Sequence, residues 1–142
     1  MDFSFFDFDQ YAITETSNPL IIGDHKATTV IVTYDADFNE YNELISKIFK
    51  AVNIDLANQA MIVQLKENQE INLASHLTDG TQKIFVFGIN PKLLGLNASF
   101  KAYREYKTED FYIVFSHALK DLSTQTNFKK ALWTVLQESF NI

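Results

Sequence analysis

Four short runs of consecutive apolar residues constrain the fold of this chain more than any other feature. They cover residues 28–34, 61–65, 83–89 and 111–115, and they are rich in β-branched and aromatic side chains. Apolar residues follow one another within each run without alternating with polar ones, which is typical of a strand buried on both faces in a parallel sheet. Longer segments with apolar residues three and four positions apart lie between and after these runs, so the order of elements predicts an α/β fold.

The predicted helices complete a three-layer α/β/α arrangement around a four-stranded parallel sheet. Asp37 and Glu40 fit a capping box at the start of the first helix. A short helix is expected at 73–77, and Pro91 is suited to the first turn of another helix, which we expect to continue to Tyr103. A final helix carries Phe128, Ala131, Leu132, Val135, Leu136 and Phe140. Right-handed crossovers would then place helices on both faces of the sheet.

Length and composition narrow the class of protein. The chain has 142 residues, of which 46% are hydrophobic, so a single domain with a sizeable core is expected. It contains no cysteine, which excludes disulfides and thiolate metal sites. No run of 18 apolar residues exists and the first residues are acidic rather than basic, so we expect neither a membrane span nor a signal peptide. A cytoplasmic protein is the expectation.

The charge is unevenly distributed and divides the chain into two parts. Residues 1–25 carry five acids and no Lys or Arg, whereas residues 26–142 carry 13 acids and 12 bases. We interpret 1–25 as an acidic aromatic segment and 26–142 as one α/β domain. The segment fits either an edge strand or helix lying on the domain, or an anchor for a partner. Basic residues elsewhere are interspersed with acids, which does not favour sequence-specific DNA binding.

Polar residues follow the predicted strands where parallel sheets usually hold their sites. Asp35, Gly88, Asn90, Ser116 and His117 all come at carboxyl ends, so they could line one crevice. Asp, Asn and His around a crevice would suit hydrolysis, but each residue also fits a cap or a turn.

Metal and cofactor motifs are not recognisable in the sequence. The three histidines lack a spacing typical of metal ligands, and no glycine-rich phosphate-binding motif is present. We therefore predict neither a metal nor a cofactor.

The C-terminal region carries a more specific pattern. Residues 116–122, SHALKDL, are followed after five residues by FKKALW at 128–133. This pattern resembles the C-terminal signature of the DNA polymerase III psi subunit family, in which a leucine, an aspartate and another leucine precede a helix with a basic residue and Leu-Trp. The spacing matches without a gap. His117 and Thr126 stand at positions where that family commonly has proline.

A weaker match lies near the N-terminus. Residues 11–14, YAIT, followed by Pro19-Leu20, resemble the psi family's N-terminal segment, although Ala12 replaces its glycine and its tryptophan is missing. The resemblance implies a non-catalytic fold like that of uracil-DNA glycosylase. It also implies docking of this segment on the clamp-loader ATPase, and binding of a chi-type subunit that contacts single-stranded-DNA-binding protein. The side chains expected to dock are Phe3, Phe5, Phe6, Phe8, Tyr11 and Ile13.

Two other functions remain open from the sequence. Residues 88–91, Gly-Ile-Asn-Pro, are similar to a motif of mismatch-specific uracil or thymine glycosylases, although those enzymes carry it after the first strand and here it follows the third. A base-excising enzyme would use an Asn such as Asn90 to position water beside a flipped nucleotide. The remaining alternative is an α/β interaction protein unrelated to replication.

Overall fold

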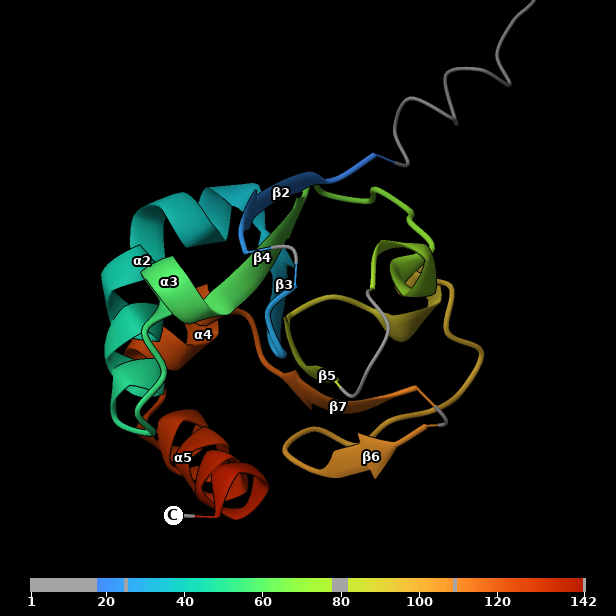
Figure 1. Cartoon of the computed structure of the whole chain (residues 1–142). Helices are drawn as coiled ribbons and strands as arrows, with labels where there is room; N and C mark the ends of the chain where they lie inside the picture. Colours follow the sequence, from blue (N-terminus) through green and yellow to red (C-terminus); the bar gives the residue numbers. More distant parts are fainter. Residues whose placement is uncertain (1–17, 25, 78–81, 109, 142) are drawn as a thin grey trace, which may run out of the picture.

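The fold is built on one mixed sheet of six strands. The computed structural model describes residues 18–24, 26–77, 82–108 and 110–141. In the described chain the strands are β2 (Leu20–Gly23), β3 (Thr29–Tyr34), β4 (Ala60–Leu65), β5 (Gln82–Phe87), β6 (Glu105–Lys107) and β7 (Phe111–Ser116). They lie side by side in the order β2-β4-β3-β5-β7-β6 (Figure 1).

The four predicted strands form the parallel centre of this sheet. Strand β3 pairs in parallel with β4 on one side and with β5 on the other, and β5 pairs in parallel with β7. All six residues of β4 are buried, and five of six in β3, β5 and β7. The uninterrupted apolar runs correspond to strands covered on both faces, as the sequence indicated.

The prediction of a four-stranded, all-parallel sheet is wrong because both edges carry an additional antiparallel strand. Strand β2 pairs with β4 and strand β6 pairs with β7. Both edge strands are short, at four and three residues, and neither forms a long apolar run. Strands at a sheet edge are often this short, and a short strand gives a weak signal in a sequence.

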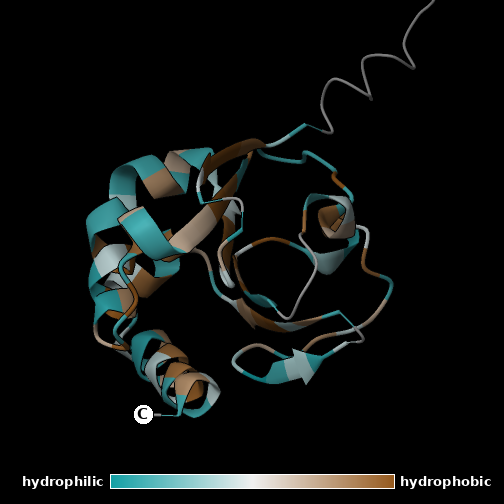
Figure 2. Ribbon diagram, viewed as in Figure 1, coloured by the Kyte–Doolittle hydropathy of each residue, from teal (hydrophilic) through white to brown (hydrophobic). Residues whose placement is uncertain are grey.

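All four α-helices of the described chain pack on one face of the sheet. They are α2 (Asp35–Lys50), α3 (Leu56–Gln59), α4 (Leu119–Thr124) and α5 (Thr126–Phe140). Their buried residues form one core cluster with strand residues of this face, including Ile31, Phe85 and Val114. Figure 2 shows the hydrophilic residues of α2 turned outward and the apolar residues concentrated along the strands. None of the described helices is long and apolar enough to span a membrane.

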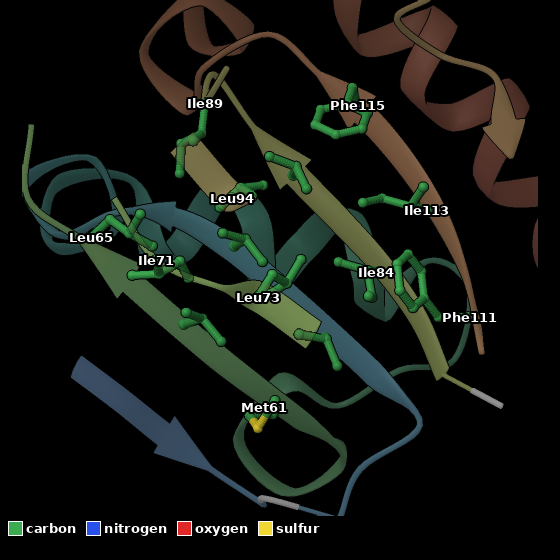
Figure 3. Packing of buried hydrophobic residues seen from close by; sticks show 14 of the residues in the cluster. Met61, Leu65, Ile71, Leu73, Ile84, Ile89, Leu94, Phe111, Ile113 and Phe115 are labelled. Atoms are coloured by element: carbon green, nitrogen blue, oxygen red, sulfur yellow. The ribbon is translucent and has the colours of Figure 1, made fainter. Parts of the chain in front are cut away.

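The opposite face is covered by 3-10 turns and loops, so the expectation of α-helices on both faces is wrong for the described residues. The turns are η1 (Leu73–His76) and η2 (Pro91–Leu94), and their buried Leu73 and Leu94 pack on the strands together with Ile71 and Ile89 (Figure 3). The helix expected to run to Tyr103 ends after one turn. Gly95 follows η2 with φ of +76°, a left-handed conformation that terminates a helix.

The first long helix also begins differently from the prediction. It starts at Asp35, two residues before the expected cap, and Tyr34 precedes it without a side-chain cap. The Asp35 carboxylate accepts a hydrogen bond from the Ala36 N–H at 2.7 Å. Asp37 therefore lies inside the first turn and does not act as the capping residue. The positive end of the helix dipole stabilises acidic side chains at such a position.

Candidate functional site

Four of the five predicted crevice residues come together at the carboxyl ends of β5 and β7. Gly88, Asn90, Ser116 and His117 line a crevice of about 360 Å³, together with residues that include Phe100, Phe115 and Asp121. The fifth residue, Asp35, does not line it. The crevice is thus lined by residues from the ends of β5 and β7, and the end of β3 lies outside it.

The base of the crevice is a close contact between two strand ends. The Gly88 N–H donates to the Ser116 carbonyl at 2.9 Å. Gly88 has φ of +75°, and a Cβ on it would lie 2.5 Å from the Ala118 Cβ. Only glycine fits this position without strain, because both the backbone conformation and the space exclude a side chain. Gly88 thus has a structural role in bringing β5 against the residues that follow β7.

Asn90 uses its side chain to cap the turn that follows. Its Oδ1 accepts a hydrogen bond from the Lys92 N–H at 3.0 Å, at the start of η2. Pro91 occupies the first position of this turn, where a missing N–H costs nothing. The oxygen that would position a hydrolytic water in a base-excising enzyme is therefore engaged with the backbone of its own chain.

His117 belongs to a stacked aromatic group at the rim of the crevice. Its ring lies 3.7 Å from that of Phe128, with an angle of 5° between the two planes. Its Nδ1 lies 2.7 Å from the Tyr103 hydroxyl oxygen, and the same oxygen accepts a hydrogen bond from the His117 N–H at 3.3 Å. Tyr103 has φ of +61°, an unusual conformation for a residue other than glycine. This group, His117 with Tyr103 and Phe128, connects the loop before β6 to α5.

Ser116 also has its hydroxyl engaged locally. It is buried, and its Oγ donates to the His117 carbonyl at 3.1 Å and lies 3.5 Å from the Tyr103 hydroxyl. His117 lies next to it in the chain, but no hydrogen bond joins the Ser116 Oγ to the His117 ring among the contacts of the described residues. A nucleophilic serine requires such a bond to its base. The pair therefore shapes the corner without the geometry of a nucleophile and its base.

Asp35 lies in a different and larger pocket. This pocket, of about 650 Å³, is lined by Asn18, Pro19, Leu20, Asp35, Gln64 and residues 66–69. It lies where the chain enters β2 and where β4 ends. The Gln69 side chain closes part of it by donating to the Asn18 carbonyl at 2.9 Å.

Two further acidic groups lie at this end of the molecule: Asp37, which the sequence placed after the first predicted strand, and Asp121, which the predicted crevice did not include. Burial raises the pKa of Asp37. The Lys120 ammonium lowers this pKa, and the Asp121 and Glu40 carboxylates raise it further. Among the described residues that line the crevice, Asp121 is the one carboxylate, and the sequence offered no signal for it beyond its place in the segment 116–122. In the described residues, no three His, Asp or Glu side chains gather in a way that could hold a metal ion.

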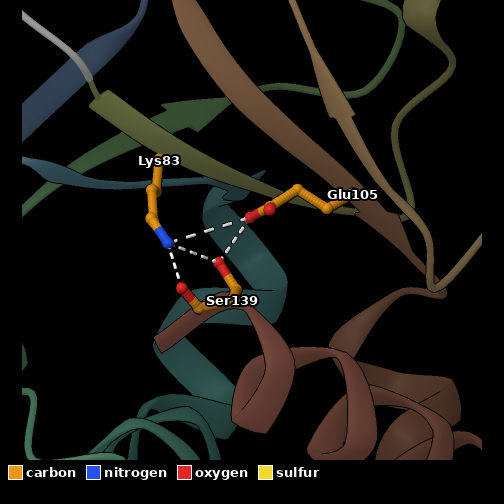
Figure 4. Close-up of polar contacts among 3 residues, drawn as sticks. All are labelled: Lys83, Glu105 and Ser139. Carbon is orange, nitrogen blue, oxygen red and sulfur yellow. Dashed lines mark hydrogen bonds and ion pairs between the residues drawn. The ribbon is translucent and has the colours of Figure 1, made fainter. Parts of the chain in front are cut away.

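A second polar group lies at the opposite, amino-terminal end of the strands and was not anticipated. Lys83 of β5 donates to the carbonyl of Ser139 near the end of α5 and to its Oγ at 3.0 Å, while the Ser139 hydroxyl donates to Glu105 of β6 (Figure 4). Ser139 is buried, and Lys83 and Glu105 are each about 28% exposed. The group closes the helix end and joins three elements, and its serine is inaccessible to a substrate.

The predicted docking residues lie outside the described part of the chain. Phe3, Phe5, Phe6, Phe8, Tyr11 and Ile13 all belong to residues 1–17. Leu20–Gly23, which follow them within the acidic segment 1–25, form the edge strand β2.

The fold and the crevice together define a mixed α/β protein whose polar residues at the strand ends are used to hold its own loops. No protein-family model matches the chain, and no curated protein matches it.

Proposed function

We propose that this chain is a non-catalytic, cytoplasmic adaptor subunit of the DNA polymerase III holoenzyme, similar to the psi subunit. It would link the clamp-loader ATPase to a chi-type subunit and, through that subunit, to single-stranded-DNA-binding protein. The proposal rests on the resemblance at 116–133 and on the chemistry of the crevice. It needs neither a metal nor a cofactor.

One observation supports the proposal that the chain is not a catalyst: the crevice side chains contact other groups of the same chain. The Asn90 oxygen caps η2, the Ser116 hydroxyl bonds to the neighbouring carbonyl, and the His117 ring is stacked on Phe128. A hydrolytic site needs at least one such group directed at the substrate or at water. Groups engaged by their own backbone favour a scaffold over an enzyme.

The packing of the C-terminal corner supports the resemblance. Leu119, Leu122 and Leu132, at signature positions, are all fully buried, and Trp133 is half-buried against the same cluster. These are the positions that a family defined by its fold would need to keep apolar. His117, which stands at the family's proline position, replaces a rigid turn residue with a stacked and hydrogen-bonded one.

The sheet supports the uracil-DNA glycosylase-like part of the proposal only at its centre. The four central strands, in the order β4-β3-β5-β7, are parallel, as the resemblance would require. The antiparallel edges β2 and β6 are additions to that plan. On one face, 3-10 turns stand where the plan has α-helices, which is a departure from it.

Docking on the clamp loader is assigned to the aromatic residues of the N-terminal segment. Phe3, Phe5, Phe6 and Phe8 provide a large apolar area, and aromatic side chains dominate binding energies at interfaces. The direct test is a binding assay between the purified full chain and the clamp-loader ATPase of the organism that encodes it. Replacing these four phenylalanines by alanine should abolish the complex, and retention of full affinity would remove the segment from the mechanism.

A matched control keeps this assay specific. Leu20→Ala and Ile22→Ala remove exposed apolar area from β2, close to the same segment in the chain, and should leave clamp-loader affinity nearly unchanged. Loss of binding in this control as well would place the contact on the domain.

Glycosylase activity is the second candidate, and the motif at 88–91 is the observation that favours it. If the chain is a glycosylase, it releases uracil from DNA, and Asn90→Ala abolishes the release. We expect no release by the wild-type chain at high protein concentration, because the Asn90 oxygen accepts the Lys92 N–H and so holds the side chain against its own backbone. Uracil release that disappears in Asn90→Ala would contradict the adaptor proposal.

An interaction protein with no role in replication is the third candidate. Recovery of partners on the full chain from a native lysate distinguishes it, because the adaptor should capture clamp-loader subunits. A partner set without replication proteins would favour this candidate instead.

A further inference from the structure

The pocket beside Asp35 has a buried glutamine side chain in its lining. Gln64 lies in β4, between β2 on one side and β3 on the other. It is two residues from Ile62, which belongs to the core beneath the helices, so both side chains point to the helical face of the sheet. Only 5% of Gln64 is exposed, yet it is one of the residues that line this pocket of about 650 Å³.

The Gln64 amide forms no hydrogen bond with another described residue. Its neighbour in the register, Thr33 of β3, has a buried hydroxyl that is likewise unpaired within the described chain. Buried polar side chains are usually hydrogen-bonded, because an unpaired one destabilises the fold. A glutamine retained where an apolar side chain would be more stable favours a role in binding.

The wall of the pocket next to Gln64 is held in place by hydrogen bonds. The Gln69 Oε1 accepts from the Lys66 N–H at 2.8 Å, and its Nε2 donates to the Asn18 carbonyl at 2.9 Å. Gln69 is itself buried and thus ties the turn at 66–69 to the chain before β2. Pro19 and Leu20 add apolar surface to the lining. A preformed pocket of this size, mostly apolar with a few polar groups, is typical of small-molecule sites.

The charges around the pocket favour a positively charged ligand. Among the described residues that line it, Asp35 and Glu67 are acidic and Lys66 is the one base. Burial, followed by the charges of Glu67 and Asp37, raises the pKa of Tyr34, so both carboxylates act on the end of β3. The first turn of α2 carries Asp35 and Asp37, which offset the positive end of the helix dipole. An anion would therefore be disfavoured here.

We propose that this pocket binds a small molecule carrying a guanidinium group. The Asp35 Oδ1 accepts from the Ala36 N–H, which leaves its Oδ2 to accept from the ligand. The Gln64 carbonyl oxygen supplies a second acceptor in the lining of the pocket. A guanidinium is planar, positively charged and rich in donors, so it can bond to a carboxylate and a carbonyl together. The site does not depend on the adaptor function.

Titration calorimetry of the full chain with L-arginine tests the site. We expect saturable binding by the wild-type chain. L-citrulline, which has an uncharged urea in place of the guanidinium, should bind at least about tenfold more weakly because the charge-assisted hydrogen bonds are lost. Asp35→Asn should weaken arginine binding by a similar factor. Glu40→Gln is the matched control, since it removes the same charge from α2 outside the pocket, and it should leave the affinity nearly unchanged.

Gln64→Leu distinguishes a binding role from a structural one. It should abolish arginine binding, whereas its Tm should equal or exceed that of the wild-type chain, because an apolar side chain of similar size replaces an unpaired polar one. A large fall in Tm would overturn the proposal, since the Gln64 amide would then have a partner in the protein. Each of three binding results would also overturn it: no arginine binding by the wild-type chain, L-lysine or L-citrulline binding as tightly as L-arginine, or unchanged arginine affinity in Gln64→Leu or Asp35→Asn.

Discussion

At the scale of single residues, the two glycines that follow β5 and η2 distinguish the cost of backbone strain from the cost of a steric clash. Both have positive φ, at +75° for Gly88 and +76° for Gly95, but a Cβ on Gly88 would overlap Ala118 whereas the nearest atom to one on Gly95 is 3.5 Å away. We expect Gly88→Ala to lower the free energy of unfolding by roughly 2–4 kcal/mol, and Gly95→Ala by about 1 kcal/mol. Urea denaturation measures both. Equal losses would show that the contact with Ala118 relaxes freely.

The Tyr103 hydroxyl should have a measurable role in the stability of the crevice rim. It contacts the His117 ring nitrogen and accepts from the His117 N–H. Tyr103→Phe should lower the free energy of unfolding by about 0.5–1.5 kcal/mol, since net hydrogen bonds in water are of this size. Tyr112→Phe is the control, because Tyr112 contacts Lys83 and Lys107 through its ring, and we expect a change below about 0.5 kcal/mol. Thermal or urea unfolding of the two variants compares them directly.

Asp37 should give a distinct pH dependence. Its pKa is raised above the ordinary value of 3.8, mainly by burial, so the folded state holds this proton more tightly than the unfolded state. The stability it contributes is present below the ordinary pKa and is lost as the pH rises through the raised value. The difference in free energy of unfolding between Asp37→Asn and wild type should therefore favour the variant more near pH 7 than near about pH 4. A difference that stays constant over this range would contradict the assignment.

At the scale of elements, the Lys83, Ser139 and Glu105 group should determine how firmly α5 is attached to the sheet. Lys83 donates to the Ser139 carbonyl near the helix end, where a cation also favours the helix dipole. Lys83→Met keeps the apolar stem and should cost about 1–2 kcal/mol, most of it from the lost hydrogen bonds rather than from the ion pair with the partly exposed Glu105. Denaturation at low and high salt checks this, because a large salt effect would indicate that the ion pair dominates.

Elements buried on both faces were predictable from sequence, and elements at edges were not. The strands β3, β4, β5 and β7 follow from their uninterrupted apolar runs. The edge strands β2 and β6 are short and half solvated, so their residues carry little pattern. The helix expected after Pro91 illustrates a competing signal, because its spaced leucines favoured a helix while Gly95 ended it after one turn. Leu94 is still buried in the core, so the spacing of the leucines indicated burial and did not indicate the length of the helix.

At the scale of the whole molecule, strand ends could be predicted but the direction of their side chains could not. Gly88, Asn90, Ser116 and His117 meet because parallel strands end at the same edge. Asp35 diverges to another pocket because it begins α2. The stack of His117 on Phe128 depends on how α5 returns across the sheet, and no local pattern contains that information.

The proposed adaptor function also belongs to this scale, because it assigns different roles to the two ends of the chain. In this proposal the domain is a rigid, non-catalytic body, in which signature leucines such as Leu119 and Leu132 are packed. The proposal assigns docking to the aromatic residues Phe3, Phe5, Phe6 and Phe8 of the segment before β2.

The most direct test of the adaptor function is the affinity of the purified full chain for the clamp-loader ATPase of its own organism, measured by isothermal titration calorimetry. The account predicts a saturable complex for the wild-type chain and no detectable heat of binding for the variant with Phe3, Phe5, Phe6 and Phe8 all replaced by alanine. A wild-type chain that shows no binding, or a quadruple variant that binds as tightly as wild type, would contradict it.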